Sequence, residues 1–312
     1  MTTLVEVARR AGVSKSTVSN VIQGSAAVAE ATRKRVEKAI RETGYRPNAI
    51  ARSLRARTSH SIGMIVPDLS NPFHAALSVA VERAAKRHGY ATLVAHTDCA
   101  PDIEIEVSRA LFERRVDAVV IAGLSTGSDM PVSLLDNGIP VVLASFGGPS
   151  DQRLGSVDHD DIAAMESVVD HLFALGHRKF TFVSQSYAEQ SGERRRQGFE
   201  LALKRRGLVE VQRAQATAVV AHNDLIALDL IDEIERGGRM VPQDVSVTGH
   251  DDIPLAAHSR IRLTTVRSDA TFMGERAIEL VMRAMQAGGH VAHREIYTNP
   301  LVVRHTTGAA PQ

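Results

Sequence analysis

Hydrophobic positions follow two different patterns along this chain. In residues 1–58 they recur at helical spacing within three short segments. From Ser61 onward, short runs of consecutive apolar residues alternate with longer amphipathic segments. Strands without polar alternation that are separated by helices indicate a parallel sheet covered on both faces. The pattern therefore predicts a small helical unit followed by a larger α/β unit.

The larger unit repeats the strand and helix pattern in two halves. In the first half, strands are predicted at 62–67, 92–95, 116–121 and 139–143, with helices at 73–88, 103–113 and 131–137. In the second half, helices are predicted at 162–175, 193–206, 225–236 and 270–287, with strands at 179–184, 217–221, 245–249, 263–266 and 301–304. Two α/β lobes with a cleft between them follow from this order, and ligands of such sheets bind beyond the carboxyl ends of the strands.

The first two helical segments have the spacing of a helix-turn-helix. Ala8 is small where two helices must cross, Gly12 allows the positive φ of a tight turn, and Val18 anchors the second helix. Ser14 is a suitable N-cap for this second helix over residues 15–21, and a third helix is predicted over 30–42. The exposed face of the second helix is polar and short-chained, which suits base edges and phosphate oxygens. A helical hairpin without a ligand would have the same pattern.

Residues 48–56 form a short basic segment with one exposed apolar side chain. Asn48 can cap two helical turns, which are too short to be stable alone in water. Leu54 lies between Arg52 and Arg55, and an apolar wedge flanked by arginine fits insertion into the minor groove of DNA. An ordinary basic linker accounts equally well for the same residues.

Charge is distributed unevenly between the two units. Residues 1–58 hold twelve lysines and arginines against four acidic residues, whereas the rest of the chain holds 25 against 32. A basic head on an acidic body indicates a unit that binds a polyanion, attached to a unit with another task.

The head resembles that of the lactose/purine-repressor (LacI/GalR) family of transcription factors. The resemblance rests on Thr3 through Ser19, on Thr32-Arg-Lys-Arg-Val36, on Gly44-Tyr-Arg-Pro-Asn48 and on Ala51-Arg-Ser-Leu54. It implies that Lys15, Ser16 and Asn20 read bases, that 48–56 is a hinge helix that folds on operator DNA, and that Leu54 is its wedge. Asn20 stands where arginine is common, and Ala29 where serine is common. The residues expected to contact DNA are Thr3, Ser14, Lys15, Ser16, Thr17, Ser19, Asn20, Asn48, Ala51, Arg52 and Leu54.

Polar and aromatic side chains follow several of the predicted strands of the body. Asp68, Phe73 and His74 follow the first strand, and Ser145 and Phe146 follow the strand at 139–143. In the second half, Asn223 and Asp224 follow one strand, Asp251 and Asp252 follow another, and Arg195 starts a helix. Their convergence on a cleft suits a small polar ligand with a flat apolar face. For Asp224 and Asp252 we expect helix capping instead, and for Asp251 and Arg195 we expect ligand contact.

The body extends the resemblance to the same family. The motifs are Pro67-Asp-Leu-Ser-Asn-Pro-Phe73, Gly176-His-Arg178, Asn223-Asp-Leu-Ile-Ala227, Val241 to Val247, His250 to Ala256, and Leu263-Thr-Thr-Val-Arg267. They imply a periplasmic-binding-protein-like fold with three crossovers between the lobes. The effector contacts of the family fall on Phe73, Ser145, Phe146, Arg195, Asn223 and Asp251, and Ser145 replaces a frequent aspartate.

We expect a helix-turn-helix domain with hinge over 1–58 and an effector and dimerisation domain over 59–312. Within the effector and dimerisation domain, we expect the N-lobe to comprise residues 59–161 and 269–298 and the C-lobe to comprise residues 162–268 and 299–312.

A shortened connection marks the second lobe. Only nine residues, 208–216, separate the helix at 193–206 from the next strand, where the family usually has a further edge strand and helix. We interpret this as the deletion of one βα unit. If the preceding helix kept its face of the sheet, the crossover would be left-handed, which is strongly disfavoured. Alternatively, residues 209–212 form a remnant edge strand, with too few residues left for a parallel crossover. The hypothesis is a less stable second lobe and impaired effector binding.

Composition and motifs exclude several other classes. The single Cys99, the absence of an apolar run of about 18 residues and the absence of a signal-peptide pattern predict a cytoplasmic protein without disulfides or membrane spans. No phosphate loop, nucleophile elbow or His-Glu-x-x-His motif is present, so we expect no catalytic residue, metal or cofactor. A transport-type binding protein would fit the body alone. The expected function is a transcriptional regulator, in the family usually a repressor, that acts as a homodimer on a palindromic operator under the control of a small molecule such as a sugar or related metabolite.

Overall fold

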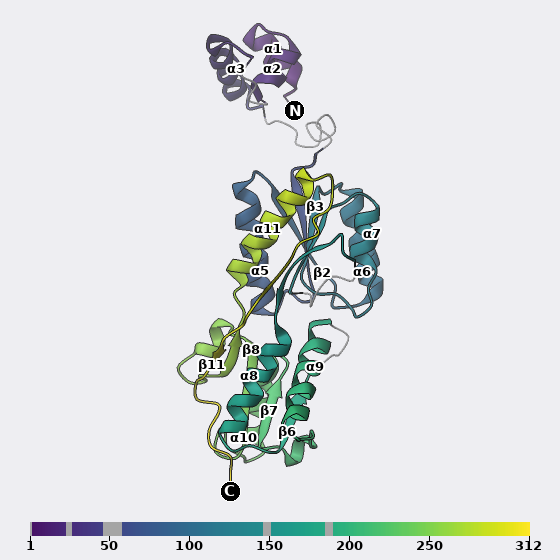
Figure 1. Cartoon of the computed structure of the whole chain (residues 1–312). Coiled ribbons are helices and arrows are strands. Elements are labelled where there is room, and N and C mark those ends of the chain that lie inside the picture. Colours follow the sequence, from purple (N-terminus) through teal and green to yellow (C-terminus); the bar gives the residue numbers. More distant parts are fainter. Residues whose placement is uncertain (1, 23–26, 46–57, 146–150, 185–189) are drawn as a thin grey trace. The chain divides into compact units, whose positions relative to one another are not determined.

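The computed structural model describes residues 2–22, 27–45, 58–145, 151–184 and 190–312. The chain divides into two compact units, Met1–Ser59 and His60–Gln312 (Figure 1). Asn48, Ala51, Arg52 and Leu54 lie outside the described residues, as do the rest of the expected hinge helix and Phe146.

The first unit is a helix-turn-helix with a third supporting helix. Its helices are α1 (Leu4–Ala11), α2 (Lys15–Ile22) and α3 (Glu30–Thr43). Gly12 ends α1 with a left-handed backbone at φ 63°, and the Ser14 hydroxyl accepts a hydrogen bond from Thr17 N at 3.1 Å, which caps α2 as expected. Val7, Val18 and Val36 are fully buried between the three helices.

The second unit contains two separate sheets. The first is six-stranded, in the order β10-β5-β4-β3-β1-β2, and all its pairings are parallel. Its strands are β1 (Ser61–Val66), β2 (Ala91–His96), β3 (Ala118–Ile121), β4 (Val141–Ala144), β5 (Gly155–His159) and β10 (Arg294–Tyr297). Helices α5 (Pro72–Arg87) and α11 (Ala270–Gln286) pack against one face, and α6 (Pro101–Glu113) and α7 (Met130–Asp136) against the other. We call this sheet and its helices the N-lobe.

The second sheet, with its helices, forms the C-lobe. Its order is β11-β9-β8-β7-β6, from β6 (Phe180–Val183), β7 (Ala218–Ala221), β8 (Ser246–Asp251), β9 (Thr264–Arg267) and β11 (Leu301–Val302). Helices α8 (Asp161–Ala174) and α9 (Gln190–Arg205) cover one face, and α10 (Asp224–Arg236) covers the other. The parallel α/β class is confirmed, although the short β11 pairs antiparallel with β9.

Two strands of the N-lobe sheet, β5 and β10, were not predicted from the sequence. Every residue of β5 is buried, but only one of its five side chains, Val157, is aliphatic. Strand β10 lies at the edge of the sheet and alternates exposed and half-buried residues. Neither strand therefore has the apolar run by which the other strands were found.

No helix among the described residues is long and apolar enough to cross a membrane.

The shortened connection passes round the free edge of β6. Leu208 still packs on the face that α8 and α9 cover, whereas Ala216 is buried on the opposite face with α10. Between them, Glu210 forms a single parallel bridge with Phe180, the first residue of β6. The 3₁₀ turn η1 (Arg213–Gln215) then leads into β7. The sequence predicts a left-handed crossover from α9 to β7 if α9 keeps its face of the sheet. The chain avoids it, because the connection passes to the other face of the sheet before it enters β7.

The carboxylate of Glu210 satisfies part of the exposed edge of β6. Val211 N donates to Phe180 O at 2.9 Å, but the chain turns away before it reaches Phe182. Phe182 N instead donates to Glu210 Oε1 at 2.8 Å, and Arg196 Nη2 on α9 donates to Glu210 Oε2 at 2.5 Å. A side chain therefore takes the place of the carbonyl that a neighbouring strand would offer.

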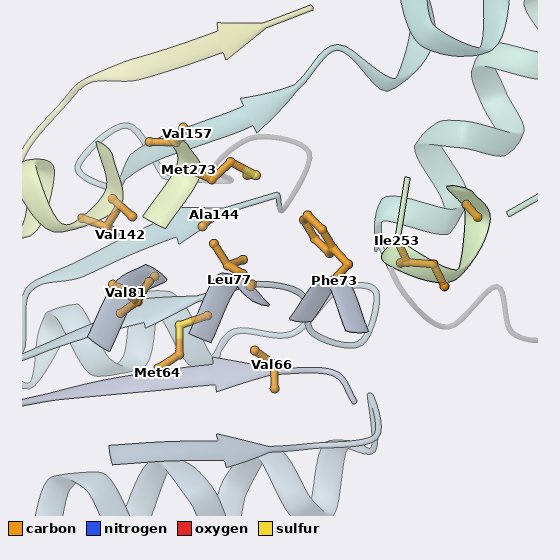
Figure 2. Packing of buried hydrophobic residues seen from close by; sticks show 14 of the residues in the cluster. Met64, Val66, Phe73, Leu77, Val81, Val142, Ala144, Val157, Ile253 and Met273 are labelled. Carbon is orange, nitrogen blue, oxygen red and sulfur yellow. The ribbon is translucent and has the colours of Figure 1, made fainter. Parts of the chain in front are cut away.

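The largest cluster of buried apolar residues reaches from the N-lobe to the C-lobe. Figure 2 shows Met64, Leu77, Val81 and Met273 between the N-lobe sheet and the pair of helices α5 and α11, with Phe73 at the end nearest to Ile253 of the C-lobe. Phe73 is 5% exposed and Ile253 is 3% exposed. This packing fixes Phe73 where the two lobes meet.

Candidate functional site

Helix α2 carries five of the seven described residues that we expect to contact DNA. Lys15, Ser16 and Asn20 are exposed, whereas Thr17 and Ser19 are half-buried. Thr3 and Ser14 are also exposed, but the Ser14 hydroxyl already bonds to Ser16 and Thr17. The polar surface of α2 thus lies on a three-helix unit with a buried apolar core.

A pocket of about 300 Å³ lies at the carboxyl ends of strands from both lobes, and we call it the interlobe pocket. Of the six residues expected to contact the effector, the structure brings five together in its lining: Phe73, Ser145, Arg195, Asn223 and Asp251. The sixth, Phe146, is outside the described residues. Residues that are far apart in sequence therefore share one cavity.

Local structure places each of these five side chains. Phe73 is the second residue of α5, whose N-cap Asn71 accepts a hydrogen bond from Phe73 N. Asn223 caps α10 by accepting from Ile226 N at 3.0 Å. Ser145 follows β4 with φ 59°, and Asp251 ends β8 with φ 109°. Arg195 lies in the second turn of α9, which begins at Gln190 rather than at the expected Glu193.

The Arg195 guanidinium is buried between two carboxylates. Its Nε donates to Asp161 Oδ1 at 3.1 Å, its Nη1 to His222 O at 2.8 Å, and its Nη2 lies 3.6 Å from Asp251 Oδ1. Burial alone would raise the pKa of Asp251, but the hydrogen bond from His250 and the charge of Arg195 hold that pKa well below its usual range. Asp251 is therefore ionised and acts only as an acceptor.

Two buried histidines lie behind the pocket. His159 Nδ1 is 3.2 Å from Ser145 Oγ, and His250 Nδ1 is 3.1 Å from Asp251 Oδ1. The two rings are 6.1 Å apart between centroids. Burial lowers the pKa of His159 to about 3, and burial together with the charge of Arg195 lowers the pKa of His250. Both rings are consequently neutral at physiological pH.

The expectation that Asp224 and Asp252 cap helices is wrong. Asn223 caps α10, and Asp224 instead accepts hydrogen bonds from Ile253 N and from the Thr265 hydroxyl. Burial and the charge of Asp251 raise the pKa of Asp224 to about 8. Asp252 binds Arg267 and Arg304 in ion pairs. Both side chains stabilise the loop after β8, and neither lines the pocket.

Several lining residues were not identified from the sequence. They include Asp98 and Cys99, which follow β2, and Ser191 and His222, near the start of α9 and after β7. The rule that ligands bind beyond strand ends, applied to β2 as well, would have found the first two. A larger cavity of about 450 Å³ lies between α6 and α7, and its lining contains none of the expected site residues. Among the described residues, no group of three or more His, Cys, Asp or Glu side chains could hold a metal ion.

A helix-turn-helix unit in one chain with a two-lobed body and a ligand-sized pocket defines the class of ligand-responsive DNA-binding regulators. Comparison with known proteins identifies the family. Residues 3–48 match the model of the lacI family of bacterial regulatory proteins, and residues 169–307 match a periplasmic binding protein-like domain. The transcriptional repressor PurR of Photobacterium profundum is 32% identical over 336 residues, covering 97% of this chain and 98% of the relative. The chain belongs to the LacI family.

Solved structures agree with this assignment of the fold. The lac repressor dimer bound to operator and the anti-inducer ONPF has a TM-score of 0.87 at 24% identity, with 99% of each chain covered. The CelR–cellobiose complex, a transcriptional regulator, has a TM-score of 0.71 at 26% identity, covering 98% of this chain and all of the other. Repressors of this family bind operator DNA, form dimers and bind small-molecule effectors, and the homologues are regulators rather than enzymes.

Proposed function

We propose that this chain is a cytoplasmic homodimeric repressor whose affinity for a palindromic operator is set by an effector in the interlobe pocket. The observation that carries the proposal is the convergence of Phe73, Ser145, Arg195, Asn223 and Asp251 from both lobes on one cavity. A ligand that contacts both walls stabilises one arrangement of the lobes. DNA and effector then change each other's affinity by the same factor.

On the DNA side, the proposal assigns base contacts to Lys15, Ser16 and Asn20 of α2. The hydroxyls of Ser14, Thr17 and Ser19, together with Thr3, are assigned to phosphates. The segment 48–56, with Asn48, Ala51, Arg52 and Leu54, is assigned to the hinge helix and its minor-groove wedge. The domain boundaries proposed are 1–58 for this DNA-binding part and 59–312 for the effector and dimerisation part. Within the latter, the N-lobe spans 59–161 and 269–298, and the C-lobe 162–268 and 299–312.

The proposed effector is a neutral, polyhydroxylated molecule such as a sugar. Three carboxylates line the pocket, Asp68, Asp98 and Asp251, against one guanidinium among the described lining residues, Arg195. Segments 146–150 and 185–189 contain no lysine or arginine that could add a positive charge. An anionic ligand would meet net repulsion, whereas hydroxyl groups can donate to the carboxylates. The cellobiose bound by the CelR protein is a ligand of this kind.

We also propose that the chain has lost a βα unit at 208–216. The alignment with the PurR protein runs over 336 residues, more than the 312 of this chain, so that relative contains residues that this chain lacks. None of the described residues that line the interlobe pocket comes from 208–216. Because Glu210 bridges to the first residue of β6, this segment lies at the opposite end of the strands from the pocket. The geometry thus favours a C-lobe that keeps its effector site.

The experiment that tests the function is selection of bound sequences from a random duplex library, with binding followed against salt concentration. A palindromic motif with a steep decrease of affinity with salt is the expected result. Addition of a panel of neutral sugars and of their phosphates then identifies the effector by a change in operator affinity. Non-specific binding alone would contradict the regulator proposal, and a response only to sugar phosphates would contradict the effector class.

A further inference from the structure

The Arg195 guanidinium of the interlobe pocket is held by a carboxylate that lies outside the pocket. Asp161, the first residue of α8, does not line the pocket, yet its Oδ1 accepts a hydrogen bond from Arg195 Nε at 3.1 Å. Asp251, which does line the pocket, has its Oδ1 3.6 Å from Nη2 of the same guanidinium. Two carboxylates therefore face one guanidinium, and these three side chains together hold one net negative charge.

The close packing of α8 against α9 brings Asp161 to Arg195. Gly198 follows Arg195 by three residues, so both lie on the same face of α9. A Cβ at Gly198 would lie 2.9 Å from Ile162 Cα and 3.2 Å from Asp161 O, so a larger residue would push α9 away from the first turn of α8. Asp160 is the N-cap of α8, and the positive end of the helix dipole favours a negative charge at Asp161. The local structure thus fixes Asp161 as a charged partner of Arg195.

Burial makes this ion pair stronger than the other charges of the pocket. Burial alone would raise the pKa of Asp161, but the charge of Arg195 lowers that pKa below its ordinary value, so Asp161 is ionised. Asp161 is 3% exposed and Arg195 is 4% exposed, and water therefore screens their interaction little. Asp98 also lines the pocket, but it is exposed and its charge is screened. The two buried carboxylates therefore balance the charge of Arg195 more effectively than Asp98 does.

We infer that Asp161 is a specificity-determining residue, which neutralises Arg195 from outside the pocket and thereby excludes anionic effectors. A guanidinium has several N–H donors and remains a donor when its charge is balanced, so Arg195 can donate to an oxygen of a neutral ligand. A carboxylate or phosphate of a ligand would have to compete with Asp161 and Asp251 for the same guanidinium, at the cost of like-charge repulsion. Arg195 thus orients a neutral ligand and does not attract an anion.

This inference deepens the proposed function and rests on the interlobe pocket being the effector site. Asp161→Asn keeps an oxygen that accepts from Arg195 Nε and removes one negative charge. Asp160→Asn is the matched control, because it removes the same charge one residue away and asparagine also caps a helix. The neutral sugar that changes operator affinity is compared with its uronic acid, in which a carboxylate replaces the terminal CH2OH group. We expect Asp161→Asn to raise the affinity for the uronic acid relative to the sugar by about tenfold or more, and Asp160→Asn to change it much less.

A second measurement needs no effector. Inorganic phosphate is titrated into the full chain at about pH 8, where histidine side chains are largely neutral, and its binding is followed by nitrogen-15 NMR of Arg195 Nε. The signal is assigned by its loss in Arg195→Lys. We expect it to respond at a phosphate concentration about tenfold or more lower in Asp161→Asn than in the wild-type chain. Asp161→Ser serves the same purpose if the asparagine variant fails to fold.

Three outcomes would overturn the role of Asp161. They are equal phosphate responses of wild type and variant, an unchanged ratio of the affinities for uronic acid and sugar, and a wild-type chain that binds the uronic acid as tightly as the sugar. Selection of bound DNA tests the regulator proposal independently, so failure of the one is distinguished from failure of the other.

Discussion

Arg195 and Asp251 lie 3.6 Å apart inside the interlobe pocket, and each side chain is only 4% exposed. Arg195 is also tied to Asp161, and Asp251 to His250. Three groups, Asp161 on α8, Arg195 on α9 and His250 on β8, therefore hold the Asp251 carboxylate at the pocket wall, where it can accept a hydrogen bond from a ligand.

Asp251→Asn is expected to abolish the response to effector while operator binding remains. The amide cannot accept from both His250 and a ligand as strongly as the carboxylate does, so effector affinity should fall at least about tenfold, or about 1.4 kcal/mol. Asp252→Asn is the matched control, because Asp252 pairs with Arg267 and Arg304 away from the pocket. Titration of operator complexes with effector measures both variants. Loss of operator binding by Asp251→Asn would show a structural role instead.

Acid is expected to destabilise the folded body through its buried histidines. The folded-state pKa of His159 is lowered to about 3, below the value of about 6.5 in an unfolded chain. The unfolded state therefore binds more protons in this window, and the free energy of unfolding falls as pH drops below about 6.5. The slope reaches about 1.4 kcal/mol per pH unit for each such histidine, and His250 adds to it.

Urea unfolding at pH 7.0 and at lower pH values measures this slope. His159→Gln should make it shallower by up to about 1.4 kcal/mol per pH unit. His290 is exposed, and His290→Gln serves as the control substitution. Equal slopes for wild type and His159→Gln would mean that His159 is charged in the folded chain.

Two substitutions of Glu210 test how its carboxylate stabilises the edge of β6. Glu210→Ala leaves the Phe182 N–H without its acceptor and should lower the free energy of unfolding by about 1–3 kcal/mol. It should also promote association, because a free strand edge pairs with other chains. Glu210→Gln keeps an acceptor for Phe182 N and loses only the ion pair with Arg196, at a cost of about 1 kcal/mol or less. Urea unfolding and light scattering distinguish the two variants, and equal losses would refute the role of the hydrogen bond.

Leu54→Ala is expected to weaken specific operator binding far more than non-specific binding. The wedge acts only where a base step opens, whereas non-specific binding depends on phosphate contacts. Leu69 of the body is 40% exposed, and Leu69→Ala is the matched control. The affinities of both variants for operator and for random duplex, measured at one salt concentration, test this prediction. Equal losses on both DNAs would exclude a wedge.

Asn20→Arg is expected to change base preference and leave the salt slope nearly unchanged. Asn20 is exposed on α2, where arginine can reach a guanine in the major groove. Repeating the selection from random duplexes with the variant measures the preference. An identical selected motif would remove Asn20 from the recognition surface.

The sequence predicts the α/β class and most of the helices and strands because buried parallel strands appear as apolar runs. It misses β5, whose residues Gly155, Ser156, Asp158 and His159 are buried but not aliphatic. Such a strand is stable because its polar groups have partners, as when Ser156 donates to Asp158. Those partners are distant or paired only after folding, so no local pattern reveals them.

The same limit applies to the site. Phe73, Ser145, Arg195, Asn223 and Asp251 could be placed at strand ends and by resemblance to the family. The contacts of His159 with Ser145 and of His250 with Asp251 depend on the tertiary fold of each lobe, and the contact between the two rings depends on the packing of one lobe against the other. Glu210 was visible only as part of a short connection, and its bond to Phe182 depends on the path of the chain round β6.

The segment 208–216 meets β6 at the end of the strands that is remote from the interlobe pocket, and Val209 within it is 78% exposed. A reporter domain inserted next to Val209 would therefore join the C-lobe through a surface turn and leave the pocket walls intact. The surface turn at 208–216 is thus a place where this sheet can be extended without contact with the pocket.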